Sequence, residues 1–206
     1  VSDEGGFDDQ SFNQSGKEGL DKAKSELGVK EIAVESQSAA DYPTNVDSLV
    51  QQGCNLIIGV GFNLAEDMTK AAKANPDIEF ALIDSSFTED GLKNARPLIF
   101  KTSEAAYLAG YAAAGTSRSG KVATYGGQAI PTVQIFMDGF AQGVAKYNED
   151  KGKDVQVLGW DSKNPDAGSF VGDFSNTTKG QQLTEQFLSQ GADIILPVAG
   201  PVGLGT

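Results

Sequence analysis

The sequence predicts an α/β protein built as two doubly wound parallel-sheet lobes joined by a hinge. Segments with the period of a strand alternate with segments with the period of a helix. This alternation begins again at Lys121, after a Gly- and Ser-rich stretch at residues 115–120 that we interpret as the hinge. With 206 residues, 39% of them hydrophobic, the chain can form two cores. We therefore predict an N-terminal lobe at residues 1–115 and a C-terminal lobe at residues 116–206.

The first lobe is expected to open with a loop and a helix. The helical pattern at residues 19–27 ends at Gly28, because glycine readily takes the left-handed conformation that closes a helix. Ser11 or Asp9 is expected to cap the start of this helix. Strand and helix patterns then alternate. We expect strands at residues 29–35, through Ile57 and Ile58, at 78–83 and at 98–100, and helices at residues 42–52, 64–74 and 103–115.

The second lobe repeats this organisation. We expect strands at residues 122–125, 155–160 and 194–198, and helices at residues 132–148 and 177–190. The first strand of the first lobe is reduced to Val1 and Ser2, and the second lobe stops after its third strand. We therefore expect both lobes to be incomplete and the native chain to continue on both sides.

The composition excludes several classes of function. Sixteen basic and 28 acidic residues give a net charge of −12, which argues against nucleic acid or an anionic membrane surface as a partner. Without histidine, neither a Ser-His-Asp centre nor the usual zinc site can form, and we expect no metal and no cofactor. Cys54 lies in an apolar run and is interpreted as a core residue. No apolar run is long enough to span a membrane.

Two catalytic motifs are matched only in part. The sequence GVG at residues 59–61 resembles the start of a dinucleotide fingerprint, but Leu64 occupies the position of the third glycine. A nicotinamide enzyme is therefore not predicted. Acidic residues could also form an acid/base pair, although solvated or ligand-binding carboxylates are the commoner outcome. The pairs considered are Asp8 with Asp9 and Asp84 with Asp3.

Loops at the carboxyl ends of the strands are the expected ligand-binding positions of such sheets. In this sequence they carry aromatic and acidic residues but almost no cations. Carboxylates accept hydrogen bonds from hydroxyl groups, and aromatic rings stack on flat bases. We therefore predict an uncharged, polyhydroxylated ligand with a flat ring. The loops lie at residues 3–13, 61–63, 84–87, 126–131, 172–175 and 199–203.

The first of these loops, DEGGFDDQSFNQ at residues 3–14, offers the most recognition groups. It combines a flexible glycine backbone and several carboxylates with the hydroxyl of Ser11, the ring of Phe12 and the carboxamide of Asn13. The alternative interpretation of this stretch is a capped surface turn.

Five stretches of the chain together resemble a known family. They are DEGGFDDQSFNQ (3–14), LIIGVGF (56–62), PDIEFALID (76–84), YLAG (107–110) and AGPVG (199–203). They resemble the basic membrane protein family, lipid-anchored substrate-binding proteins of ABC transporters whose best-understood type is the purine nucleoside receptor. The resemblance covers the full length. It implies the type I periplasmic-binding fold, in which two α/β lobes close on a nucleoside.

The resemblance also implies the residues of the site. Phe12 matches the ring that stacks on the base, and Asn13 matches a neighbouring polar contact. Phe174 matches the aromatic residue of the other lobe, although SNTT at residues 175–178 departs from the usual Asp-Pro-Ala form. The family's later ribose-binding Asp and its Lys lie beyond Thr206. The predicted ligand-binding residues are Asp3, Asp9, Phe12, Asn13, Gly61, Asp84, Phe174 and Gly200.

We therefore predict a solute-binding protein, not an enzyme. It captures a nucleoside of the adenosine, guanosine or inosine type and delivers it to an ABC transporter permease. It is expected to be extracytoplasmic, attached to the cell membrane only through a lipid anchor outside this sequence. The alternative is a nucleoside- or sugar-processing enzyme on a similar scaffold. A transcription regulator is disfavoured by the acidic balance and by the absence of a basic helix-turn-helix stretch.

Overall fold

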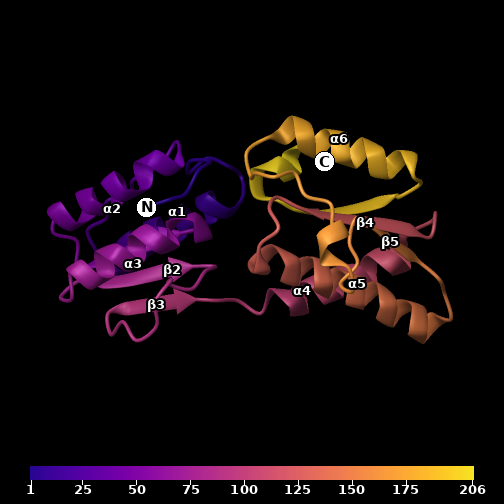
Figure 1. Cartoon of the computed structure of the whole chain (residues 1–206), viewed down its shortest axis with the longest axis horizontal. Helices are drawn as coiled ribbons and strands as arrows, with labels where there is room; N and C mark the ends of the chain where they lie inside the picture. Colours follow the sequence, from indigo (N-terminus) through magenta and orange to yellow (C-terminus); the bar gives the residue numbers. More distant parts are fainter. The chain divides into compact units, whose positions relative to one another are not determined.

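The computed structural model describes residues 1–206, the whole chain (Figure 1). The chain forms two compact units, unit 1 at Val1–Phe100 and unit 2 at Lys101–Thr206. Each unit contains a three-stranded sheet in which all strand pairs are parallel. The predicted α/β class with parallel sheets is thus confirmed. No helix combines the length and the apolar character that crossing a membrane requires.

Unit 1 is built around a sheet with the strand order β1-β2-β3. Its strands are β1 (Leu56–Val60), β2 (Glu79–Ile83) and β3 (Ala95–Leu98). Its helices are α1 (Phe12–Leu27), α2 (Tyr42–Gln51) and α3 (Ala65–Ala74), with short 3-10 turns η1 (Ala39–Asp41) and η2 (Phe62–Leu64). Gly28 closes α1 in the left-handed conformation, with φ 68°, as predicted.

Helices cover both faces of this sheet. Side chains alternate between the faces along a strand, so the register that pairs Ile57 with Phe80 puts both on one face. There they form the main core of unit 1 together with Met68 of α3 and buried residues of α2. Val60 faces the opposite side, where Gly16 of α1 packs so closely that an added Cβ would lie 3.1 Å from a Val60 methyl group. Unit 1 is therefore doubly wound.

The strand predicted at residues 29–35 does not form. Its backbone pairing with the N-terminal residues is limited to a hydrogen bond from Ser2 N to Val34 O (3.0 Å) and an isolated bridge between Glu4 and Ser36. A regular strand needs a longer ladder of bonds than this. The strand predicted from the alternating apolar pattern is therefore wrong.

The third strand begins earlier than the predicted residues 98–100, because Asn94 fixes its start. The Asn94 side-chain amide donates to three backbone carbonyls, and the backbone carbonyl of Asn94 accepts from Phe80 N at 2.7 Å. The apolar residues Ile99 and Phe100 follow the strand and are more than half exposed. The three carbonyls belong to Ala72, Asn75 and Ile78.

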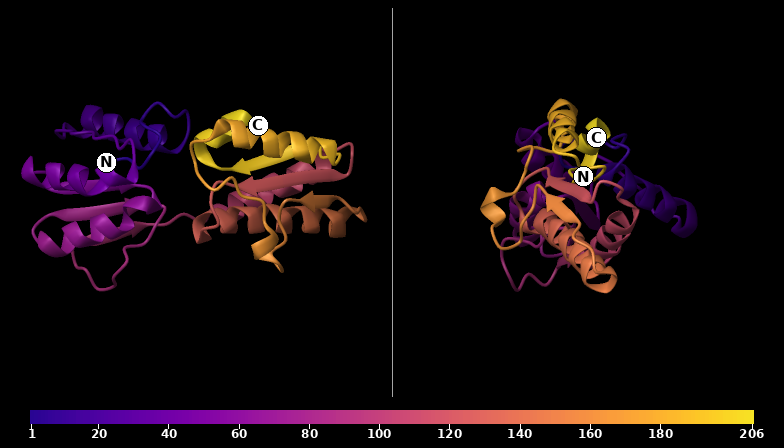
Figure 2. Two further views of the ribbon diagram at one scale, coloured as in Figure 1. Left: turned by 45° about the horizontal axis from the view of Figure 1, so that its top comes forward. Right: turned by 90° about the vertical axis from the view of Figure 1, so that its right-hand side faces the viewer.

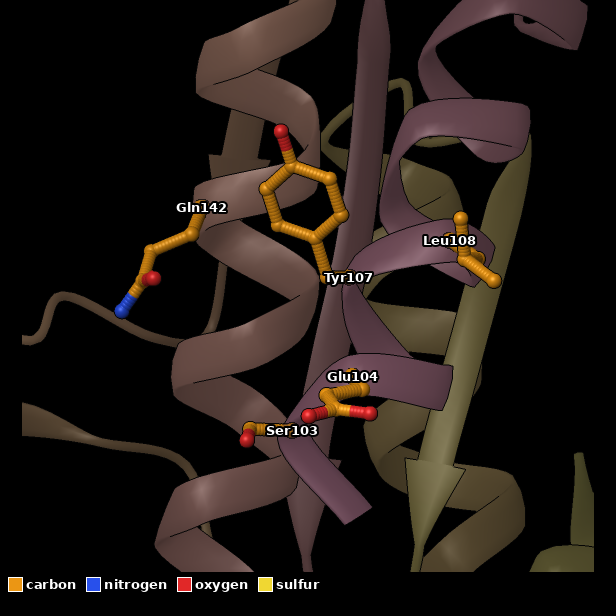
Figure 3. Close-up of a pocket in the computed structure, with 5 residues that line it drawn as sticks. All are labelled: Ser103, Glu104, Tyr107, Leu108 and Gln142. Atoms are coloured by element: carbon orange, nitrogen blue, oxygen red, sulfur yellow. The ribbon is translucent and has the colours of Figure 1, made fainter. Parts of the chain in front are cut away.

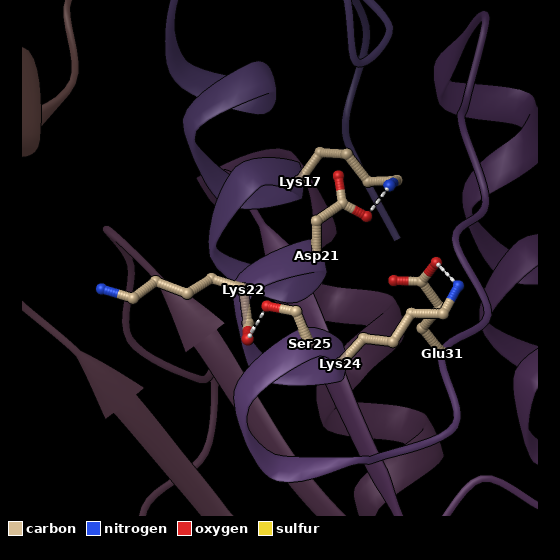
Figure 4. A network of polar contacts seen from close by, with 6 residues as sticks. All are labelled: Lys17, Asp21, Lys22, Lys24, Ser25 and Glu31. Carbon is tan, nitrogen blue, oxygen red and sulfur yellow. Dashed lines mark hydrogen bonds and ion pairs between the residues drawn. The ribbon is translucent and has the colours of Figure 1, made fainter.

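The outer surface of α1 carries a set of polar contacts (Figure 4). Lys17 pairs with Asp21 one turn later. Lys24 reaches beyond the helix to Glu31, with the Nζ and Oε1 atoms 2.8 Å apart, so this pair connects α1 with the extended segment that follows. Exposed ion pairs contribute at most about 1 kcal/mol each, so the packing of Gly16 on Val60 is the firmer attachment of α1.

Unit 2 has the strand order β5-β4-β6. Helices α4 and α5 cover one face of its sheet and α6 covers the other (Figures 1 and 2), so it is also doubly wound. Its strands are β4 (Lys121–Gly126), β5 (Gln156–Leu158) and β6 (Ile194–Val198). Its helices are α4 (Thr102–Thr116), α5 (Pro131–Lys151) and α6 (Thr177–Ser189), with 3-10 turns η3 (Pro165–Ala167) and η4 (Gly200–Gly205).

Glycines let α4 and α5 approach backbone to backbone. A Cβ on Gly110 would overlap the carbonyl of Phe140, and a Cβ on Gly143 would overlap the carbonyl of Tyr107. This packing makes α4 part of unit 2. The units therefore divide between Phe100 and Lys101, about one helix earlier than the boundary predicted at residues 115 and 116.

The Gly- and Ser-rich stretch at residues 115–120, interpreted as the hinge, is tied down within unit 2. The carboxylate of Asp193 accepts hydrogen bonds from the hydroxyl of Ser117 (2.6 Å) and from the backbone N–H groups of Arg118 (2.6 Å) and Ser119 (2.9 Å). The bond from Ser117 is the largest of the effects that lower the pKa of Asp193 to about 2. The stretch predicted as the hinge therefore lies inside unit 2, and the boundary between the two compact units lies between Phe100 and Lys101.

Candidate functional site

Three predicted site residues lie in a row at one edge of the unit 1 sheet. Asp3, Gly61 and Asp84 each follow the last residue of a parallel segment, and each donates its backbone N–H to the neighbouring segment. The acceptors are the carbonyls of Val60 (3.1 Å), Ile83 (3.2 Å) and Leu98 (3.0 Å), respectively. Because these bonds extend the ladder, the carboxyl ends of the strands bring the three residues together.

Gly61 makes room for Asp3. Its backbone has φ 106° and ψ 149°, a conformation restricted in practice to glycine, and a Cβ at this position would overlap the Asp3 carboxylate. The glycine thus has a clear structural task beside its predicted role as a ligand contact. It leaves space beside β1 that the carboxylate of Asp3 occupies.

Burial raises the pKa of Asp3 from 3.8 to about 7, because the charged form loses contact with water. The hydrogen bond from Asn13 Nδ2 to Asp3 Oδ1 (3.0 Å) acts in the opposite direction, and the nearby Glu4 and Asp9 raise the pKa further. A carboxyl group with this pKa changes its charge near neutral pH. In its protonated form it can donate a hydrogen bond to a ligand, and in its ionised form it can accept one.

Asp84 occupies the third position of the row in a strained conformation. Its φ is 60°, one of only two positive φ values at residues other than glycine in the chain. Partial burial raises its pKa from 3.8 to about 6. Strained backbone of this kind gathers at functional sites, because surrounding structure must hold it in place.

The start of α1 completes the group in unit 1. Phe12 is the first residue of the helix and is partly exposed, whereas Asn13 is only 2% exposed. Asn13 Nδ2 donates to Asp3 Oδ1 and to the Glu4 carbonyl, but its Oδ1 atom is buried without a hydrogen-bond partner. Asp9 is 7% exposed and faces the helix N-terminus. The six predicted residues of unit 1 thus fall into two adjoining groups. Asp9, Phe12 and Asn13 lie at the start of α1, and Asp3, Gly61 and Asp84 form the row at the end of the sheet.

In unit 2, Phe174 belongs to an aromatic and aliphatic cluster. It packs with Trp160, Val133 and Met137, and a Cβ on Gly127 would collide with its ring. Trp160 is held by a hydrogen bond from its Nε1 to Asp138 Oδ1 (2.8 Å). The Phe174 ring is therefore placed by the backbone of Gly127 beneath it and by the cluster around it.

Residues on both sides of Phe174 form a cap for α6. Asp173 Oδ1 accepts hydrogen bonds from the backbone N–H groups of Ser175 (3.0 Å) and Asn176 (2.7 Å). Asn176 occupies the N-cap position, and its Oδ1 accepts from Lys179 N at 3.0 Å. The sequence SNTT, which departs from the form expected by resemblance, therefore still builds a helix start directly after Phe174.

Gly200 lies at the carboxyl end of the unit 2 sheet. It follows β6 and opens η4 with φ 52°. The backbone of Gly127 connects this edge, because its N–H donates to the Val198 carbonyl (2.9 Å) and its carbonyl accepts from Gly172 N (2.7 Å). Gly200 and the loop of Phe174 therefore flank the end of the central strand β4.

Sequence reasoning assigned no role to Gly127 or Trp160. Gly127 lay in a loop selected as ligand-facing, but its close approach to Phe174 has no signature in the sequence. Trp160 was assigned to the end of a strand, and its bond to Asp138 joins residues 22 positions apart. Only the tertiary structure shows that both support the Phe174 ring.

An open groove of about 380 Å³ lies between the side chains of α4 and α5 (Figure 3). None of the predicted site residues lines it. Leu108, one of its lining residues, is 69% exposed. The lining residues are Ser103, Glu104, Tyr107, Leu108 and Gln142.

Comparison with known proteins identifies the family. Residues 1–206 match the Bmp family, described as ABC transporter substrate-binding protein PnrA-like. The chain belongs to this family. The relationship confirms the resemblance found in the sequence, and it places the residues described above in a substrate-binding fold.

Two relatives show how far the similarity extends. The chain is 34% identical over 209 residues to the ABC transporter nucleoside-binding protein BmpA of Lactococcus lactis, which aligns with 100% of this chain and 55% of that protein. It is 31% identical to basic membrane protein A of Borreliella burgdorferi, with coverage of 98% and 56%. The chain therefore spans about half the length of these relatives.

Solved structures agree with this assignment. An ABC transporter solute-binding protein from Aeropyrum pernix K1 superposes with a TM-score of 0.84 at 31% identity, covering 100% of this chain and 56% of that one. A myo-inositol binding protein from Caulobacter shares the fold, with a TM-score of 0.63 at 14% identity and coverage of 100% and 66%. The type I periplasmic-binding fold predicted from the sequence is confirmed.

Proposed function

We propose that this chain forms the ligand-binding part of an extracytoplasmic receptor that captures a purine nucleoside for an ABC transporter permease. The observation that carries the proposal is the row of Asp3, Gly61 and Asp84 beside the start of α1. Two carboxyl groups here can bond to hydroxyl groups, and Asn13 offers a carboxamide to a base. The name of the Lactococcus lactis relative, a nucleoside-binding protein, supports the same ligand class.

The aromatic rings of the two units support a ligand with a flat base. Phe12 begins α1 and Phe174 lies on Gly127, and each is proposed to contact the base. A ring stacked on a base contributes about 1–3 kcal/mol. In the row of unit 1, no Lys or Arg side chain forms an ion pair with Asp3 or Asp84 that would neutralise these carboxyl groups. Without a basic side chain beside these carboxyl groups, the row suits the hydroxyl groups of a ligand better than a phosphate group.

A purine nucleoside is the proposed ligand, of the adenosine, guanosine or inosine type, and the proposed action is binding without chemical conversion. Calorimetry with inosine, guanosine, adenosine, adenine and ribose tests the first part. Nucleosides should bind more tightly than either the free base or the free sugar, because they engage both kinds of group. Binding of ribose alone with full affinity would refute the role given to the aromatic rings.

A second measurement tests the proposal that the protein is not an enzyme. Each nucleoside is incubated with the protein and the mixture is separated by liquid chromatography. The nucleoside should be recovered intact, while formation of free base or of a new sugar product would favour the enzyme alternative. Membrane attachment is proposed to occur through a lipid anchor outside residues 1–206, and fatty-acid labelling of the protein in its native cells tests this point.

A further inference from the structure

The carboxylate of Asp9 binds the backbone at the start of α1 through both of its oxygen atoms. Its Oδ1 atom accepts hydrogen bonds from Ser11 N (2.9 Å) and Gln14 N (3.0 Å), and its Oδ2 atom accepts from Asn13 N (3.0 Å). The first N–H groups of a helix have no partners inside the helix. Asp9 accepts hydrogen bonds from two of these N–H groups, those of Asn13 and Gln14, and from the N–H of Ser11 just before the helix.

Asp9 is the carboxylate that accepts from the backbone N–H groups at this end of α1, whereas Asp3 accepts from the side chain of Asn13. Ser11 occupies the N-cap position but forms no side-chain cap bond, and the first turn contains no acidic residue. Gln10 takes a positive φ of 52°, which folds the chain back so that Asp9 lies under the helix. A negative charge at this point also favours the positive end of the helix dipole.

The same turn carries two residues of the proposed site. Asn13 is bonded to Asp9 through its backbone N–H, and its side chain donates to Asp3 Oδ1 and to the Glu4 carbonyl. Phe12 precedes it on the helix. The direction in which both side chains leave α1 therefore depends on where the first turn is held.

We propose that Asp9 is a positioning residue of the ligand site: by binding the first turn of α1, it aims Asn13 and Phe12 at the ligand. In this role Asp9 spends its carboxylate on the helix start, where it accepts three backbone hydrogen bonds and is 7% exposed, and the ligand is contacted by the residues that it holds. This inference rests on the proposed function and changes the role expected for Asp9 from a ligand contact to a support of the residues that make the contact.

The test compares Asp9→Asn and Asp9→Ala with the same two substitutions at Asp8. Asp8 is the adjacent carboxylate and is exposed, so it matches the change in charge without the contacts to α1. Two quantities are measured for each variant. They are the dissociation constant for inosine and, without ligand, the hydrogen-exchange rates of the Asn13 and Gln14 backbone amides by NMR.

We expect Asp9→Ala to weaken inosine binding by about tenfold and to accelerate exchange at Asn13 and Gln14, while exchange in β1 and β2 stays unchanged. Asp9→Asn keeps one acceptor oxygen, so it should recover part of both effects. The Asp8 variants should bind and exchange like the unmodified protein. A purely stabilising cap would instead alter the free energy of unfolding without a selective loss of affinity.

Two results would overturn the proposal. Weaker inosine binding with unchanged exchange at Asn13 and Gln14 would show that Asp9 contacts the ligand directly. Faster exchange with unchanged affinity would show that the first turn does not aim the site. If the unmodified protein fails to bind inosine, the proposed function fails instead, and unchanged exchange in Asp9→Ala would still overturn the positioning role by itself.

Discussion

The side-chain amide of Asn13 donates a 3.0 Å hydrogen bond to the carboxylate of Asp3. This bond joins the first turn of α1 to the carboxyl edge of the unit 1 sheet. Asn13 is 2% exposed and the Asp3 carboxyl is largely removed from water, so the bond is shielded. A shielded acidic group linked to a helix start has consequences for stability, for pH dependence and for ligand binding.

The first prediction concerns the pH dependence of stability. Asp3 has a folded-state pKa of about 7, above its unfolded value of 3.8, so the folded protein retains a proton that the unfolded chain releases. Its contribution to stability is complete below about pH 4 and is lost as the pH rises to about 7. Asp3→Asn removes this dependence, and the variant should gain relative stability as the pH increases through this window, by up to about 4 kcal/mol.

Urea unfolding at several pH values between 4 and 8 measures this difference. Asp84, with a pKa of about 6, contributes a similar but narrower slope that remains in the Asp3→Asn variant. Parallel stability curves for the variant and the unmodified protein would contradict the raised pKa of Asp3.

The second prediction concerns Gly61. Gly61→Ala places a side chain in a backbone conformation that costs about 1–3 kcal/mol and drives its Cβ into the Asp3 carboxylate. We expect the free energy of unfolding to fall by at least this amount and nucleoside binding to weaken as Asp3 is displaced. Gly19→Ala is the matched control, because Gly19 lies in α1 with open space around its Cβ position. This control should stabilise the protein slightly.

The third prediction concerns the aromatic rings. Phe12→Ala and Phe174→Ala should each weaken nucleoside binding by about 1–3 kcal/mol, the range for one base-aromatic stack. Phe174→Ala should also lower stability, because the ring packs in the Trp160 cluster, whereas Phe12→Ala should leave the fold intact. Calorimetry and thermal unfolding separate the two effects. Phe100→Ala serves as a control at an exposed ring, and unchanged dissociation constants for both site variants would remove the stacking role.

The fourth prediction assigns Asp84 to the sugar. Asn tolerates the positive φ of this position, so Asp84→Asn should fold normally while losing the carboxylate. We expect adenosine binding to weaken by about 10- to 100-fold, the value of one charge-assisted hydrogen bond, with little change for adenine. Asp77→Asn, an exposed carboxylate before β2, is the control. Equal losses for adenosine and adenine would assign Asp84 to a different group of the ligand.

The regular elements could be predicted from the sequence because their signals are local. Gly28 ends α1 where its left-handed conformation requires, and the apolar period predicted α2, α3 and the strands β1, β2, β4 and β6. The errors have non-local causes. Asn94 sets the start of β3 through carbonyls as far as 22 residues away, and Asp193 ties residues 117–119 from a distance of about 75 residues.

The candidate site shows the same division. The position of Asp3, Gly61 and Asp84 at the ends of successive strands follows from the rule for parallel sheets, so their neighbourhood was predictable. The engagement of Asp9 by the α1 backbone and the contact of Gly127 with Phe174 depend on loop conformations that no residue spacing specifies. Identification of the ligand-binding roles came from the family resemblance rather than from periodicity.

The register of the unit 1 sheet also makes the site adaptable. Asp3, Gly61 and Asp84 are spaced by neighbouring strands, about 4.8 Å apart, and not by loop length. Insertions in the loops at the opposite edge therefore leave this spacing intact, whereas one inserted residue within β1 or β2 would reverse every side chain after it. A protein engineer could exchange the side chains at Asp3 and Asp84 to accept a new solute, because the sheet keeps the spacing between the two positions constant.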